Sequence, residues 1–334
     1  MIVLGIETSC DETAAAVVDG GRKVLASIVA SQDDVHAPFG GVVPELASRR
    51  HLEMLVPVVR RALETAGMGL DDVEGFAVTH GPGLVGSLLI GCSAAKAIAY
   101  ARRRPLVGVN HLEGHIYAAF LEGEPPAHPF LALVVSGGHT ALYLAREPRR
   151  YECVGQTRDD AAGEAFDKVA KLLGLGFPGG PAVERIARTG DPRAVAFPTA
   201  NMSDGAPGFS FSGIKTAVSL HVRRAGPLGP SQVADVAASF QATAVKMLVR
   251  ETTKAARRAG VRRIVLTGGV AANTALREAL EGECRERGWV LHVPSRRLCT
   301  DNAAMIASAA RWVTPLAPGA YEALDAYATG ERGL

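Results

Sequence analysis

Two histidines four residues apart, His111 and His115, have the types and spacing to hold a metal ion. They follow the apolar segment 105–109, which predicts a strand, and they open a segment that we expect to be helical. Each helical residue advances by about 100°, so residues four apart lie on one face. Glu113 would then point away from that face, unlike the general-base glutamate of the metalloprotease pattern His-Glu-x-x-His. The pair therefore predicts metal binding, and its alternative is two ordinary surface or core histidines.

A third ligand is needed, and Asp301 is our candidate. An aspartate just before an apolar helical segment more commonly caps that helix, so capping is the alternative for Asp301. Two imidazoles and a carboxylate suit Fe²⁺ or Zn²⁺ and leave coordination positions open for a substrate. We expect one divalent metal, with Fe²⁺ preferred and Zn²⁺ possible.

The composition is that of a globular enzyme. The 334 residues are 48% hydrophobic and 21% charged, which excludes a disordered or fibrous chain. The length suggests two lobes, and a formal net charge of +2 does not by itself indicate a nucleic-acid binder, although arginines occur in adjacent pairs. Five scattered cysteines without a Cys-x-x-Cys pair predict reduced thiols and a cytoplasmic location. The apolar segment 84–100 is too broken to span a bilayer, so we expect no membrane association.

A pattern of three strands joined by polar turns occurs twice. The predicted strands are residues 2–7, 13–18 and 24–29, and then 130–135, 140–144 and 151–156. Such a duplicated meander is typical of the α/β actin-like, sugar kinase and Hsp70 ATPase fold, because backbone N–H groups of its tight turns receive the phosphates of a nucleotide between two lobes. The alternative is two unrelated hairpins in a mixed α/β protein. We expect one lobe from residues 1–110 plus 301–334 and the other from 111–300.

Three Gly-Gly turns in the second half of the chain, at 136–138, 178–180 and 267–269, favour a nucleotide site. Asn273, just after the last of them, can offer a donor and an acceptor to a ribose or base. The sequence contains no Gly-x-x-x-x-Gly-Lys-Ser/Thr motif, so we do not expect a P-loop ATPase.

Several helices follow from hydrophobic periodicity and helix-start residues. A long amphipathic helix follows Pro44, and its predicted apolar face contains Leu52, Leu55, Val56, Val59 and Leu63. A second helix is predicted over 159–169, with acidic residues in its first turn. Pro181 is expected at the first position of a third helix, and residues 201–212 are expected to form a surface loop.

Six motifs together make the sequence similar to the universal tRNA adenosine threonylcarbamoyltransferase family, whose members were formerly called O-sialoglycoprotein endopeptidases. The motifs are residues 6–13, 81–84, 110–115, 135–140, 209–213 and 300–302. They span nearly the whole chain, and residues 209–215 resemble the bacterial branch.

The resemblance implies an actin-like two-lobed fold with a metal held by His111, His115 and Asp301. It implies transfer of threonylcarbamoyl from threonylcarbamoyl-AMP to N6 of the adenosine just 3′ of the anticodon, in tRNAs that read codons beginning with A, with release of AMP. The implied contacts to the adenylate are Val134, Val135, Ser136, Gly137, Gly138, Asp167, Gly180 and Asn273. Two bacterial partners are also implied: a smaller paralogue of the same fold, docked on the N-terminal lobe, and a P-loop ATPase.

The implied reaction needs orientation and a proton acceptor rather than a protein nucleophile. The adenylate is already activated, and holding two substrates in line can contribute about 7–11 kcal/mol. The adenine amine is a poor nucleophile, so a carboxylate should accept its proton. Asp11 or Glu12, in the first polar turn, is the candidate for this catalytic role. The alternative role of both is to hydrogen-bond the turn.

Two other function classes remain as alternatives. One is a metal-dependent glycoprotease, against which the direction of Glu113 argues. The other is a non-catalytic nucleotide-binding scaffold or a sugar kinase, neither of which needs the histidine pair.

Overall fold

The structure is a computed structural model, and it describes residues 1–200, 205–328 and 334. Contacts within the chain divide it into two units, Met1–Pro125 with Thr300–Leu334, and Pro126–Cys299. The first boundary thus falls later than the expected one after residue 110, because helix α4 (His111–Ala118) packs against α11 (Ala303–Ala309) of the first unit. Each unit contains one five-stranded mixed sheet, which confirms the α/β class.

The sheet of the first unit has the strand order β3-β2-β1-β4-β5. Its strands are β1 (Ile2–Glu7), β2 (Glu12–Asp19), β3 (Lys23–Ser31), β4 (Gly75–Gly81) and β5 (Leu106–Asn110). The first three form an antiparallel meander, and β4 and β5 continue the sheet in parallel with β1. A tight turn joins β2 to β3, because Gly20 and Gly21 adopt positive φ there.

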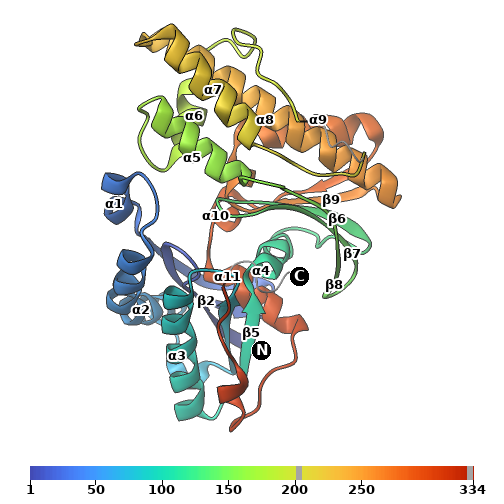
Figure 1. The fold of residues 1–334 in the computed structure, drawn as a ribbon. Helices are drawn as coiled ribbons and strands as arrows, with labels where there is room; N and C mark the ends of the chain where they lie inside the picture. Colours follow the sequence, from blue (N-terminus) through green and yellow to red (C-terminus); the bar gives the residue numbers. More distant parts are fainter. Residues whose placement is uncertain (201–204, 329–333) are drawn as a thin grey trace. The chain divides into compact units, whose positions relative to one another are not determined.

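Helices cover both faces of this first sheet. Helices α2 (Pro44–Ala66) and α3 (Val85–Arg102) pack on one face, and α4 and α11 pack on the other (Figure 1). Because side chains alternate along a strand, Leu4 and Ile6 of β1 join the core beneath α2 and α3. Gly5 and Glu7 face α4 and α11 instead. This alternation decides which residues of β1 face His111 and His115 of α4.

The predicted apolar face of α2 is wrong at two positions. Leu52 and Val56 are 67% and 63% exposed, whereas His51 and Val58 are buried. Helical spacing places residues 51, 55, 58, 59 and 62 on one stripe, and Leu52 and Val56 lie about 100° around the helix from it. The helix therefore carries apolar side chains on a second, uncovered face.

The second unit repeats the topology of the first, with the order β8-β7-β6-β9-β10. Its strands are β6 (Phe130–Val135), β7 (Thr140–Glu147), β8 (Arg150–Gln156), β9 (Arg263–Thr267) and β10 (Val290–His292). Again three strands form an antiparallel meander and two continue in parallel. This match confirms the duplicated meander that the sequence predicts.

The helices of the second unit are α5 (Ala162–Leu172), α6 (Gly179–Ala187), α7 (Ser212–Ala225), α8 (Pro230–Ala259), α9 (Thr274–Arg287) and α10 (Arg296–Cys299). Leu131 and Leu133 of β6 share a core with Phe166 of α5 and Phe240 of α8, whose rings meet edge to face. This core holds the β6 turn and the starts of α5 and α6 in one framework.

Two helix starts differ from the prediction. Helix α5 begins at Ala162, because Asp159 instead accepts hydrogen bonds at the start of α7 and Asp160 binds lysine side chains. Helix α6 begins at Gly179, so Pro181 is its third residue rather than its first.

The segment 201–212, predicted as a surface loop, is partly buried. Phe209 and Phe211 are 2% and 0% exposed, and their rings are stacked. They anchor the segment into the core of the second unit, and positions 201–204 of the predicted loop lie outside the described residues. Among the helices that the structure describes, none is long and apolar enough to cross a membrane.

Candidate metal centre

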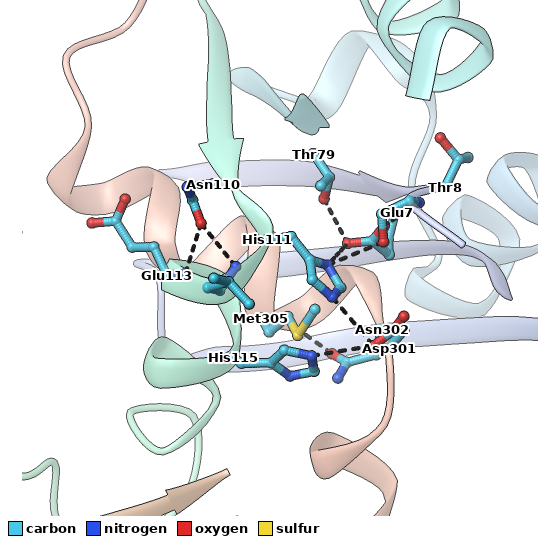
Figure 2. A network of polar contacts seen from close by, with 12 residues as sticks. Glu7, Thr8, Thr79, Asn110, His111, Glu113, His115, Asp301, Asn302 and Met305 are labelled. Carbon is cyan, nitrogen blue, oxygen red and sulfur yellow. Dashed lines mark hydrogen bonds and ion pairs between the residues drawn. The ribbon is translucent and has the colours of Figure 1, made fainter. Parts of the chain in front are cut away.

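The first turn of α4 positions both histidines. Strand β5 ends at Asn110, whose side-chain oxygen accepts hydrogen bonds from the N–H groups of Leu112 (2.9 Å) and Glu113 (3.3 Å) and so caps the helix. His111 is therefore the first helical residue, and His115 follows one turn later (Figure 2). Their ring centroids are 4.7 Å apart, and both side chains are buried.

Asp301 completes the cluster from a distant part of the sequence. Its Oδ1 lies 3.2 Å from Nε2 of His115 and 3.5 Å from Nε2 of His111. The cap of α11 is the next residue, Asn302, which accepts a hydrogen bond from the N–H of Met305 at 3.0 Å. The alternative that Asp301 caps this helix is therefore wrong, and its carboxylate faces the histidines.

These three donors fit a divalent metal ion. Their ligand atoms all lie within 4.8 Å of one another. Metal bonds of about 2.0–2.2 Å at tetrahedral or octahedral angles place neighbouring ligand atoms about 2.8–3.6 Å apart, and the two measured distances fall in that range. Imidazole nitrogen combined with carboxylate oxygen is a donor set for Zn²⁺ and Fe²⁺.

The cluster depends on close packing of β1, α4 and α11. A Cβ atom at Gly114 would lie 2.7 Å from Cδ1 of Ile306. A Cβ atom at Gly5 would lie 2.3 Å from the carbonyl oxygen of Ala303, a backbone atom that cannot rotate away. Any side chain at Gly5 would thus push the start of α11, and Asp301 with it, away from the histidines.

His111 is also held from its other side, by Glu7. Nδ1 of His111 donates to Oε2 of Glu7 at 3.1 Å, and Oγ1 of Thr79 donates to the same oxygen at 2.6 Å (Figure 2). The sequence-based prediction missed both residues. A signal was present, since Glu7 is an acidic residue that ends an otherwise apolar strand.

The two histidines differ in their electrostatic surroundings. Burial lowers the pKa of His111, but the negative charges of Asp301 and Glu7 outweigh it and raise that pKa to about 9. Burial lowers the pKa of His115, and the hydrogen bond with Asp301 offsets only part of that effect. The positive charge of His111 lowers the pKa of His115 further, whereas the hydrogen bond to Glu7 raises the pKa of His111 alone.

Glu113 lies on the side of α4 away from the histidine cluster, in agreement with its spacing (Figure 2). Its side chain is buried rather than directed to solvent, and it is not part of the cluster. A hydrolytic base of the His-Glu-x-x-His kind is therefore absent from the described metal-ligand cluster.

Asp11 and Glu12, the candidate catalytic acids, lie at the start of β2. Burial raises the pKa of Glu12 well above its usual range, and the negative charges of Asp301 and Asp11 raise it further. Of these two charges, that of Asp301 has the larger effect on the pKa of Glu12. The backbone carbonyl of Asp11 accepts a hydrogen bond from the N–H of Gln32 at 3.1 Å, so Asp11 contributes to the local turn.

Two of the three Gly-Gly turns of the second unit, at 136–138 and 267–269, lie at one edge of its sheet. Strands β6 and β9 are parallel neighbours, with Val134 opposite Thr267, so the turns that follow them lie side by side. Val134 and Val135 are fully buried, whereas Gly137 and Gly138 are exposed. Any contact to a ligand there must come from the turn and from backbone atoms.

Of the other predicted adenylate contacts, Gly180 and Asn273 lie at helix starts of the second unit, and Asp167 lies within α5. Asp167 accepts a hydrogen bond from the N–H of Gly179 at 2.8 Å, which places it beside Gly180 in the first turn of α6. Asn273 caps α9 and donates to Oε1 of Gln241 at 2.8 Å. These bonds are structural, and contact with a nucleotide stays a prediction for all of these residues.

Comparison with known proteins identifies relatives over nearly the whole chain. The family model described as TsaD, tRNA N6-adenosine threonylcarbamoyltransferase, matches residues 23–308. A tRNA N6-adenosine threonylcarbamoyltransferase from Symbiobacterium thermophilum is 59% identical over 308 residues, covering 92% of this chain and 90% of that protein. Another from Syntrophobacter fumaroxidans is 55% identical over 316 residues, with 93% of each chain covered.

Solved structures share the fold at low sequence identity. Full-length HypF in its phosphate- and nucleotide-bound form matches with a TM-score of 0.63 and 13% identity, over 93% of this chain and 46% of that one. A ROK family glucokinase from Streptomyces griseus in complex with glucose and AMPPNP matches with a TM-score of 0.51 and 13% identity, over 94% and 99% of the two chains. These matches confirm the predicted actin-like, sugar kinase fold.

Proposed function

The chain belongs to the family of tRNA N6-adenosine threonylcarbamoyltransferases, and from this we propose which of its residues carry that reaction. It is an acyltransferase that modifies adenosine in tRNA. We propose that its donor is threonylcarbamoyl-AMP, its acceptor N6 of the adenosine 3′ of the anticodon, and AMP its leaving group. The glycoprotease alternative is not favoured, because the relatives are named transferases and Glu113 lies away from the cluster.

The observation that supports a metal-dependent reaction best is the convergence of three donor atoms, two Nε2 and one Oδ1. His111, His115 and Asp301 would hold one divalent ion, and we propose Fe²⁺, because two histidines and a carboxylate with open positions are typical of it. Bound there, the ion would supply a Lewis acid for the threonylcarbamoyl oxygens. Glu12 would receive the proton that the adenine amine releases.

For the adenylate, we propose contacts from the turns of the second unit. Gly137 and Gly138 are exposed and lack side chains, so their backbone N–H groups can approach a phosphate closely. Gly180 lies in the first turn of α6, where unpaired N–H groups also favour an anion. Asn273 would offer its side-chain amide to the ribose or base.

For the protein partners, we propose that a smaller paralogue docks on the α2–α3 surface, which we define as Leu52 and Val56 of α2 with Val85 and Leu89 of α3. All four side chains are at least 41% exposed, and the two helices pack together. Adjacent exposed apolar side chains of this kind mark interaction sites.

A P-loop ATPase is the second proposed partner. We also propose a cytoplasmic location, which agrees with a tRNA substrate and with five free cysteines.

For tRNA, we propose that its backbone lies along a basic groove between α8 and α9. The groove has a volume of about 1250 Å³ and is lined on α8 by Lys246, Arg257 and Arg258. All three are exposed, and their side chains make no hydrogen bond or ion pair with any residue that the structure describes. Such unpaired cations are available to neutralise phosphates.

The test of the metal assignment is tRNA modification by purified wild type, His115→Ala and Asp301→Ala, supplied with threonylcarbamoyl-AMP. Loss of a Lewis acid worth several kcal/mol should slow both variants by about 100-fold or more. Metal content measured on the same samples should fall in parallel. His221→Ala, which removes a histidine of α7, should retain metal and rate. Equal product from all samples would show that the assignment is wrong.

A further inference from the structure

We infer that Glu7 is a positioning residue for the metal: it fixes the ring orientation and tautomer of His111 so that Nε2 faces the ion. This inference rests on the proposed metal site. Glu7 is the last residue of β1 and is fully buried, and it has no proposed contact with a substrate. Its role would be exerted entirely through His111.

The contacts of Glu7 define this role. Its carboxylate receives three donors: the N–H of Ser9 on Oε1 at 2.6 Å, and Oγ1 of Thr79 at 2.6 Å and Nδ1 of His111 at 3.1 Å on Oε2. Glu7 and Thr79 are both fully buried. Two short bonds therefore hold the carboxylate in place, and the third transmits that position to the imidazole.

The direction of the bond selects the histidine nitrogen that can bind the metal. A carboxylate accepts but does not donate, so Nδ1 of His111 must carry a proton when it bonds to Glu7. In the metal-binding neutral ring the lone pair then lies on Nε2, the atom 3.5 Å from Oδ1 of Asp301. Such carboxylate–histidine–metal arrangements fix the tautomer and raise the basicity of the ligand.

The fold explains why Glu7 and Thr79 meet there. Strand β1 runs parallel to β4 with Ile6 opposite Val78, so the next residues of the two strands are also neighbours. Alternation along β1 then turns Glu7 to the face that carries α4 and α11. Burying a carboxylate costs free energy unless hydrogen bonds compensate its charge, and a single donor would compensate it poorly.

The experiment measures Zn²⁺ affinity of the full chain by competition with a chromophoric chelator, for wild type, Glu7→Gln and Thr79→Val. Glu7→Gln keeps the shape but removes the charge, and Thr79→Val frees the carboxylate to turn. Loss of such a supporting group typically weakens metal binding 10–100-fold, and we expect that loss for Glu7→Gln and a smaller loss for Thr79→Val. Thr252→Val is the matched control, since the hydroxyl of this buried threonine donates to the Leu248 carbonyl oxygen of α8, its one side-chain bond among the described residues.

Thermal unfolding of the metal-free variants separates positioning from folding. A merely structural role would lower the unfolding temperature and leave the Zn²⁺ affinity of the folded protein within twofold of wild type, and that result overturns the inference. If Glu7→Gln does not fold, Thr79→Val decides on the same criterion. If wild type itself binds no Zn²⁺, the proposed metal site fails, an outcome distinct from unchanged affinity in the variants.

Discussion

At the scale of single residues, neighbouring groups give the two histidines of the candidate metal centre different pKa values. His111 and His115 are both buried, but the charges of Asp301 and Glu7 outweigh burial only at His111, which also bonds to Glu7. The result is a raised pKa at His111 and a lowered pKa at His115. Chemical character here comes from residues distant in sequence, chiefly Glu7 and Asp301.

Glu12 is the residue whose catalytic role can be tested most directly. We predict that Glu12→Gln slows single-turnover tRNA modification by about 10²–10⁴-fold, the usual contribution of a positioned proton acceptor. Zn²⁺ affinity should remain within twofold of wild type, because Glu12 is not one of the three ligands. Asp19→Asn, at the opposite end of β2, should keep the wild-type rate. A full rate in Glu12→Gln would leave this side chain only a structural part of the turn.

The cluster of His111, His115 and Asp301 could be predicted from the sequence, whereas the residues that support it could not. Helical spacing alone relates His111 to His115, and Asp301 follows as a plausible third donor. Whether Asp301 or Asn302 caps α11 depends on which side chain the packing of α11 turns inward, and that packing is set by Gly5 and Gly114. Glu7 was missed because its partners come from β4 and α4, whose pairing with β1 no local pattern reveals.

At the scale of elements, the strands were predictable and several helix starts were not. Strands followed from period-two and continuous apolar runs between glycine turns, signals that are local. The start of α5 depends instead on a distant loop, because Asp159 accepts hydrogen bonds from the side chains of Ser210 and Ser212 at 2.5 and 2.6 Å. These bonds lower the pKa of Asp159 against the raising effect of its burial. Asp159 would suit the start of α5, but it bonds instead to residues at the start of α7.

The uncovered face of α2 leads to a prediction about partner binding. Leu52→Asp should abolish binding of the smaller paralogue by the purified chain, because a charge would then be desolvated in an apolar interface. The unfolding temperature should hardly change, since Leu52 is 67% exposed in the chain alone. Isothermal titration with the paralogue measures the effect. Leu220→Asp, on an exposed position of α7, is the control and should bind as wild type. Unchanged binding by Leu52→Asp would remove the α2–α3 surface as the docking site.

At the scale of the whole molecule, duplication is the organising feature. Both sheets have a three-stranded meander extended by two parallel strands, yet the two units use the pattern differently. The first unit carries the two candidate metal-binding histidines after its last parallel strand, β5, while the second carries Gly-Gly turns after β6 and β9, of which the turn after β6 is exposed. Periodicity predicts the shared topology. The basic groove could not be predicted, because a net charge of +2 hides a local set of cations that only the packing of α8 against α9 reveals.

The groove leads to a prediction about the salt dependence of tRNA binding. Lys246, Arg257 and Arg258 all line the groove, and the eleven residues from Lys246 to Arg257 correspond to about 16 Å along the axis of α8. If each neutralises one phosphate, each should contribute about 0.7–0.9 to the slope of log affinity against log salt concentration. The combined variant Lys246→Ala/Arg257→Ala/Arg258→Ala should therefore lose about 2–3 from that slope.

The measurement is tRNA binding by fluorescence anisotropy from low to moderate salt, with wild type and the combined variant in parallel. The control is Arg60→Ala, which removes an exposed arginine of α2 outside the groove and should keep the wild-type slope. Weaker affinity with an unchanged slope would mean that the variant harms the fold rather than phosphate contacts, and circular dichroism of the same samples would reveal it. Unchanged affinity and slope would place the tRNA backbone on another surface of the protein.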